Sequence, residues 1–176
     1  MSIDFYRKLL KRELLFMKYK RFVISLLILF LSATALFSWY EGSGLLEDED
    51  QWKYTAVFSK VMDDDEVLEK SEIVHADFFL YAVKFHPIFP SAMTVFLLLI
   101  LFFMGFPFTN KSLTWASMIL FIIIFLLSFL VKPAEEGTAI FLNSVKFSSC
   151  GLIVCTAILR LKIQKIPINE EVMTNE

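Results

Sequence analysis

The feature that most constrains this chain is a series of apolar stretches, each long enough to cross a lipid bilayer. Residues 22–40, 87–106 and 112–131 contain no charged side chain, and residues 138–159 contain only Lys146. A helix needs ~20 apolar residues to cross ~30 Å of hydrocarbon. Backbone amides in hydrocarbon must bond within their own segment, which a helix achieves. We therefore expect an all-α membrane protein with four transmembrane helices over these ranges.

The composition leaves little room for anything else. Hydrophobic residues make up 57% of the 176 residues, and the mean hydropathy is +0.63. The two cysteines, Cys150 and Cys155, stand in one apolar stretch, so they define neither a disulfide framework nor a zinc pattern. A cleaved signal peptide is the alternative for the first stretch, because Ala33 to Ala35 resembles a cleavage site. We expect no cleavage, since the apolar run continues to Trp39 and Tyr40.

Lysine and arginine indicate the orientation of the spans, because cytoplasmic segments carry their excess. Residues 1–21 contain seven of them. If this segment is cytoplasmic, the inner segments 1–21, 107–111 and 160–176 hold eleven, and the outer segments 41–86 and 132–137 hold five. The sequence therefore predicts that both termini are cytoplasmic, with residues 41–86 forming an outer loop.

Both extramembrane segments near the first span have a predicted structure. Residues 1–21 alternate apolar and basic positions at helical spacing, which predicts an amphipathic helix facing anionic lipid. The outer loop is acidic, with Trp52 and Phe58 expected to lie on the membrane surface. Helical spacing in its second half predicts one helix over residues 64–85. Its acidic clusters lack the alternation and glycine of a calcium loop, so they are interpreted as a solvated face.

The end of the first span and the start of the loop resemble a family of small membrane proteins from Bacillus and its relatives, catalogued as a domain of unknown function. The residues that carry the resemblance are Trp39-Tyr40-Glu41-Gly42-Ser43, Trp52-Lys53-Tyr54 and Phe58-Ser59. The resemblance covers residues 22–60. It implies the plasma membrane of a Gram-positive bacterium and carries no activity with it.

Lys146 is the main candidate for a functional residue, because an ammonium group within a span costs ~2.5–3.5 kcal/mol unless it is accommodated. Asn143 and Cys150 share its helix face, which predicts a polar stripe pointing into the bundle. The alternative is that Lys146 extends outward to the interface. Glu41 is a candidate ion-pair partner for Lys146 or Lys84, or a simple turn residue.

Two histidines and an aspartate form a weaker candidate site near the outer interface. His75, Asp77 and His86 supply ligand and acid–base groups, but their spacing is common by chance. The sequence has no Gly-rich phosphate loop, nucleophile elbow or metal-binding His pair one turn apart. No cofactor, metal or nucleic acid is therefore expected.

Three function classes remain. The first is an accessory or interaction protein of the plasma membrane that docks onto a larger membrane protein or onto a second copy. The second is a transporter or channel component in which Lys146 lines the polar stripe. The third is a membrane enzyme acting at the outer face. The first class is preferred because the spans lack the carboxylates and central helix breaks typical of transporters, and no acid–base set is evident.

Overall fold

The computed structural model describes residues 3–63, 69–105 and 111–164, and every regular element in these ranges is helical. The elements are α1 (Ile3–Gly42), η1 (Ser43–Glu47), α2 (Glu49–Thr55), α3 (Val57–Asp63), η2 (Lys70–Glu72), α4 (His75–Phe85), α5 (Ile88–Gly105), α6 (Lys111–Leu130) and α7 (Glu136–Gln164). The predicted all-α class is confirmed.

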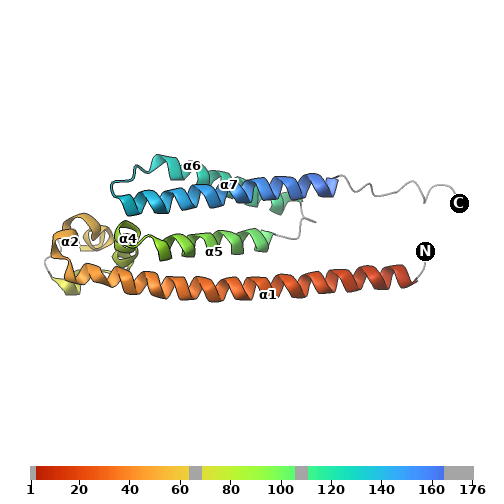
Figure 1. Cartoon of the computed structure of the whole chain (residues 1–176), viewed down its shortest axis with the longest axis horizontal. Coiled ribbons are helices and arrows are strands. Elements are labelled where there is room, and N and C mark those ends of the chain that lie inside the picture. Colours follow the sequence, from red (N-terminus) through yellow and green to blue (C-terminus); the bar gives the residue numbers. More distant parts are fainter. Residues whose placement is uncertain (1–2, 64–68, 106–110, 165–176) are drawn as a thin grey trace.

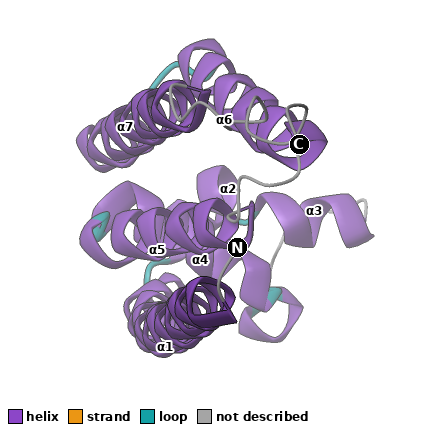
Figure 2. Ribbon diagram, turned by 90° about the vertical axis from the view of Figure 1, so that its right-hand side faces the viewer, coloured by secondary structure: helices purple, strands orange, loops and turns teal. Residues whose placement is uncertain are grey.

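Four long helices lie along the long axis, and the short elements gather at one end (Figure 1). α5 packs against both α1 and α7, and α6 packs mainly against α7. The end view shows α5 between α1 on one side and the α6–α7 pair on the other (Figure 2). We call the long helices the bundle, and the elements from η1 to α4 the cap.

Three of the long helices meet the requirements of a membrane span in length and composition. They are Met17–Glu47, Ile88–Gly105 and Glu136–Leu161, which include most of the first, second and fourth predicted spans. α6 covers 20 residues, but the part of it whose side chains are described, Thr114–Leu130, is a shorter apolar helix. The predicted inner turn at 107–111 lies almost entirely outside the described residues.

α1 is a single helix of 40 residues, so the N-terminal segment and the first span are continuous. At ~1.5 Å per residue such a helix is ~60 Å long, about twice the hydrocarbon thickness. The predicted helix in residues 3–20 is present. There is no break near Arg21 that would turn this segment into the membrane plane, and its contact with anionic lipid stays a prediction.

The predicted helix over residues 64–85 is wrong over residues 69–74, because α4 begins at His75. Residues 64–68 lie outside the described ranges. Val74 is extended (φ −79°, ψ 140°), and its N–H donates to Ser59 Oγ at 2.8 Å. A tertiary hydrogen bond therefore holds the chain in an extended conformation just before α4. The periodicity of the sequence predicts a continuous helix there, because it does not reveal this bond.

The cap has its own small core of Leu45, Trp52, Ile73 and Phe78. Trp52 is only 7% exposed, and its Nε1–H donates to the carbonyl of Leu45 at 2.8 Å. The expectation that Trp52 lies on the membrane surface is therefore wrong. An indole buries a large area and keeps one donor, so it organises a small core well when that donor finds an acceptor.

The bundle core is similarly small. Leu98, Phe121 and Leu152 come from α5, α6 and α7 and pack together. Between α1 and α5, Phe30 stacks on Phe96 with ring centroids 5.6 Å apart, and a second ring pair stacks nearer the cap. Most remaining large apolar side chains of the bundle point outward. Such an outward apolar surface suits helices surrounded by hydrocarbon.

Two glycines hold α4 between the cap ends of α1 and α7. A Cβ at Gly42 would lie 2.0 Å from the carbonyl oxygen of Phe78. A Cβ at Gly137, near the start of α7, would lie 1.9 Å from the carbonyl oxygen of Lys84. Both contacts are backbone to backbone, so no side chain can move aside to make room. Glycine is therefore required at both positions for α4 to sit where it does.

We predict that Gly42→Ala destabilises the protein, because its new methyl group overlaps the α4 backbone. The cost should be roughly 1–3 kcal/mol or more, as for other overpacked sites. Thermal unfolding followed by circular dichroism in detergent measures it. Gly151→Ala is the matched control, since a Cβ there meets nothing within 4 Å. Equal transition temperatures for the two variants would contradict the close packing of α1 and α4.

Candidate functional site

The most buried charged group of the cap is Asp77, which is 0% exposed. Its Oδ1 accepts the N–H of Phe58 at 2.8 Å, and its Oδ2 accepts the N–H of Ser59 at 2.9 Å and the Ser59 hydroxyl at 2.5 Å. Phe58 and Ser59 lie in the first turn of α3, whose amides lack partners within the helix. Asp77 thus caps α3 from a different helix, and a carboxylate is favoured there.

Two further polar side chains of α4 bind the rest of the cap. Lys84 Nζ lies 3.1 Å from Thr55 Oγ1 and 3.4 Å from Gln51 Oε1. The Tyr81 hydroxyl donates to Asp48 Oδ2 at 3.2 Å. Burial, and then the negative charge of Asp48, raise the pKa of Tyr81 above its usual value. Both groups join α4 to the segment that precedes α3.

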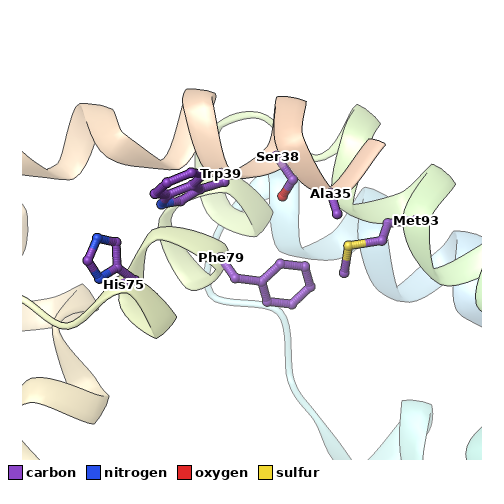
Figure 3. A pocket seen from close by; sticks show the side chains of 6 residues that line it. All are labelled: Ala35, Ser38, Trp39, His75, Phe79 and Met93. Atoms are coloured by element: carbon purple, nitrogen blue, oxygen red, sulfur yellow. The ribbon is translucent and has the colours of Figure 1, made fainter. Parts of the chain in front are cut away.

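A cleft of about 310 Å³ opens where the cap meets the bundle. Its lining residues are Ala35, Ser38, Trp39, His75, Phe79 and Met93. Trp39 and His75 lie at one end of it, and Met93 lies at the other, with the Ser38 side chain directed between them (Figure 3). The ring centroids of Trp39 and His75 are 5.7 Å apart. The sequence analysis did not find this cleft, because its walls come from three separate helices.

Two polar atoms on the same face of α1 have no hydrogen-bond partner. Ser38 is 2% exposed, and its Oγ is buried and unpaired. One turn further toward the cap, Glu41 Oε2 is also buried and unpaired. An unpaired buried polar atom costs about 1–3 kcal/mol, so each is a place where a bound group could be stabilised.

The proposed partners of Glu41 are engaged elsewhere. Lys84 binds Gln51 and Thr55 in the cap. Lys146 Nζ lies 4.5 Å from the ring centroid of Phe129, near the end of α6 closer to the cap. The structure therefore does not bring Glu41 together with either lysine. Lys146 instead extends along α7 toward the cap end, which matches the alternative of an outward-reaching side chain.

The polar stripe of α7 does not point into the bundle. Asn143 and Cys150 are both exposed, and Lys146 is only partly buried. The predicted inward stripe is therefore wrong. The small side chains that α7 turns toward the core are Ser149 and Thr156, whose hydroxyls donate to carbonyls one turn earlier in the same helix. Both hydroxyls therefore have a hydrogen-bond acceptor within α7. Asn143 lies on the exposed face of the same helix.

The two histidines do not form a site with Asp77. His75 lies between the rings of Trp39 and Phe78, whereas His86 lies 6.4 Å from the ring of Tyr81 and follows the end of α4. Asp77 is bound to α3. Among the residues whose side chains are described, no three His, Cys, Asp or Glu gather as a metal-binding group. His75, Asp77 and His86 are thus dispersed over the cap and do not form one acid–base set.

Comparison with known proteins identifies relatives over the part of the chain that contains this site. A family model described as a domain of unknown function, DUF4306, matches residues 20–109. "Uncharacterized protein YjdJ" from Bacillus subtilis (strain 168) is 36% identical over 77 residues, which is 43% of this chain and 68% of that protein. No solved structure matches. The resemblance predicted from the motif at Trp39 to Ser43 is confirmed.

We predict that Asp77→Asn loosens α3, because one of the two oxygens is replaced by an amide donor that faces an N–H. The buried group left unpaired should cost about 1–3 kcal/mol. Hydrogen exchange of the α3 amides measures the effect, and those of Phe58 and Ser59 should exchange faster. Asp50→Asn, at an exposed acid in the first turn of α2, is the control. Unchanged exchange in Asp77→Asn would show that the carboxylate does not hold α3.

Proposed function

Because this chain belongs to the DUF4306 family of unknown function, its role must be inferred from its own structure, and we propose that it is a four-span accessory protein of the plasma membrane. In this proposal the cap lies outside and both termini are cytoplasmic. The protein acts by docking the exposed face of α7 onto a neighbouring transmembrane helix.

The path of the chain supports a fourth span. α5 ends at Gly105, at the end of the bundle away from the cap, and α7 begins at the cap, where Gly137 meets Lys84 (Figure 1). The chain between them must travel the full length of the bundle, and α6 is the helix that does so. Its 20 residues span ~30 Å, which equals the hydrocarbon thickness.

Two cation–aromatic contacts support the same placement of α6 and α7. Lys146 lies over Phe129 toward the cap, and Arg160 Cζ lies 4.0 Å from the ring centroid of Trp115 at the opposite end. Lys146 and Arg160 are fourteen residues apart on α7, and their ring partners are fourteen residues apart on α6. This separation corresponds to ~21 Å along each helix. An aromatic ring of α6 thus lies against each of these two cations of α7, which lowers the cost of placing them along a membrane-spanning helix.

The distribution of basic residues supports the orientation. α1 begins and α7 ends at the same end of the bundle, opposite the cap (Figure 1). Seven lysine and arginine residues precede the apolar part of α1. The positive-inside rule then assigns this end to the cytoplasm, where the basic segment would also face anionic lipid.

The observation that carries the docking proposal is the outward face of α7. Asn143, Phe147, Gly151 and Cys155 follow one another at intervals of four residues, and all four are exposed. We call them the α7 ridge. Phe147 is 81% exposed, and nothing lies within 4 Å of a Cβ at Gly151. A ridge with one large side chain, one glycine and one amide is suited to close packing against another helix.

The side chain of Asn143 favours contact between the α7 ridge and another helix. It lies five residues, or ~8 Å, beyond the start of the apolar stretch at Thr138. A carboxamide facing hydrocarbon lacks partners, and hydrogen bonds between membrane helices contribute about 1 kcal/mol. A neighbouring helix that supplies such a bond is therefore favoured over lipid at this position.

The other two function classes receive less support. A transport role for Lys146 requires it to line an internal path, whereas its amine lies over Phe129 and the adjacent polar positions face outward. A catalytic role in the cap requires available acid–base groups. Asp77 and Lys84 are instead used in hydrogen bonds that hold the cap together.

A photo-crosslinking amino acid at Phe147 tests this proposal in living cells. We expect one discrete protein adduct, since this side chain would insert into the neighbouring helix. The matched control is the same amino acid at Leu126, which is exposed on α6 outside the ridge and should give no discrete adduct. Mass spectrometry of the adduct identifies the partner, including a second copy of the chain.

Asn143→Leu provides the second arm of that experiment. The change keeps the branching at Cγ and removes the amide, so the adduct from position 147 should decrease severalfold, in line with the loss of about 1 kcal/mol of interhelical hydrogen bonding. The level of the protein in the membrane is measured in parallel. Equal labelling at positions 147 and 126 would count against docking through the ridge. An adduct yield from position 147 that Asn143→Leu leaves unchanged would do the same.

A further inference from the structure

We propose that the cleft between cap and bundle binds one uncharged, hydroxyl-bearing glycerolipid of the outer leaflet, such as a diacylglycerol. This inference rests on the membrane placement proposed above and is independent of the α7 ridge. The walls of the cleft come from α1, α4 and α5. These helices meet where the apolar part of α1 ends at Trp39 and Tyr40.

The lining changes in character along the cleft. Ala35 and Met93 belong to apolar stretches of α1 and α5, whereas His75 belongs to the cap (Figure 3). The cleft therefore crosses from the hydrocarbon region to the aqueous interface. A ligand that fits such a boundary has an apolar part beside Met93 and a polar part beside His75. Membrane lipids have this chemistry and are present at this depth.

The size of the cleft limits how much of a lipid it holds. At about 310 Å³ it lies near the lower end of small-molecule sites, which are ~300–1,000 Å³. It can therefore take one polar group with the adjoining part of a chain, and it cannot enclose a whole lipid. The remaining chain would lie along the surfaces of α1 and α5 in the bilayer.

The polar groups select against a phosphate and in favour of a hydroxyl. None of the described residues that line the cleft is a lysine or an arginine. The Ser38 hydroxyl is buried and unpaired, so it can donate to an ester carbonyl or exchange hydrogen bonds with a hydroxyl. The unpaired Glu41 Oε2 lies one turn further along the same face and repels anions. A lipid hydroxyl that bonds to Ser38 Oγ satisfies an atom that lines the cleft and that the protein leaves without a partner.

Quenching of Trp39 fluorescence by brominated lipids tests the proposal. Trp39 is half exposed at the cleft, and Trp52 is buried in the cap core, where it gives a constant background. Trp115→Phe removes the third indole. This variant is placed in phosphatidylcholine vesicles that contain either brominated diacylglycerol or brominated phosphatidylcholine at equal mole fraction. We expect stronger and saturable quenching by the diacylglycerol.

Two variants show whether the cleft causes that preference. Ser38→Ala removes the donor and should reduce the preference about fivefold, the value of one net hydrogen bond. Ala35→Phe fills the cleft and should abolish it. Helicity is checked in both. Equal quenching of the parent protein by the two lipids, or a preference that survives both changes, would overturn the proposal.

A companion chain with Trp39→Phe and native Trp115 separates this proposal from the membrane placement. Trp115 lies at the opposite end of the bundle, exposed on α6, and should be quenched equally by both lipids. Absence of quenching by either lipid at Trp115 would mean that the bundle is not in the bilayer, and would overturn both proposals. Equal quenching at both tryptophans would overturn the lipid site alone.

Discussion

The backbone contacts at Gly42 and Gly137 determine how the cap sits on the bundle. They let α4 lie directly against the end of α1 and the start of α7. Once α4 is fixed, Asp77 on its buried side caps α3, and Phe79 completes the wall of the cleft. The interaction is steric, and only glycine leaves room for the backbone of α4 at these two positions.

The long helices were predictable from the sequence and the cap was not, for different physical reasons. A stretch of twenty uncharged residues such as 112–131 has one stable solution in hydrocarbon, so α6 begins and ends within one residue of its prediction. The cap instead contains α-helices of only seven residues, and these depend on hydrogen bonds across the fold. The bonds from Asp77 to α3 join residues eighteen and nineteen apart, a separation that periodicity cannot reveal.

Lys146 and Asn143 lie one turn apart on α7 and are accommodated differently. The lysine has a long side chain, so its amine reaches the ring of Phe129 on α6, and this contact would lower the cost of a charge within a span. The asparagine is too short to do this and stays on the outer face. The sequence drew attention to the charge. In the structure the charged group contacts an aromatic ring of the same chain, whereas the amide lies exposed and is the group on which the docking proposal relies.

The central claim is that α6 crosses the membrane and brings the chain back to the cap side, so that four spans place both termini inside. The most direct measurement is labelling of Lys132→Cys, between α6 and α7, in a chain with Cys150→Ser and Cys155→Ser. A membrane-impermeant maleimide applied to intact cells should label position 132, and Glu176→Cys in the same background should react only after permeabilisation. Labelling of position 176 in intact cells, with position 132 protected, would contradict the account.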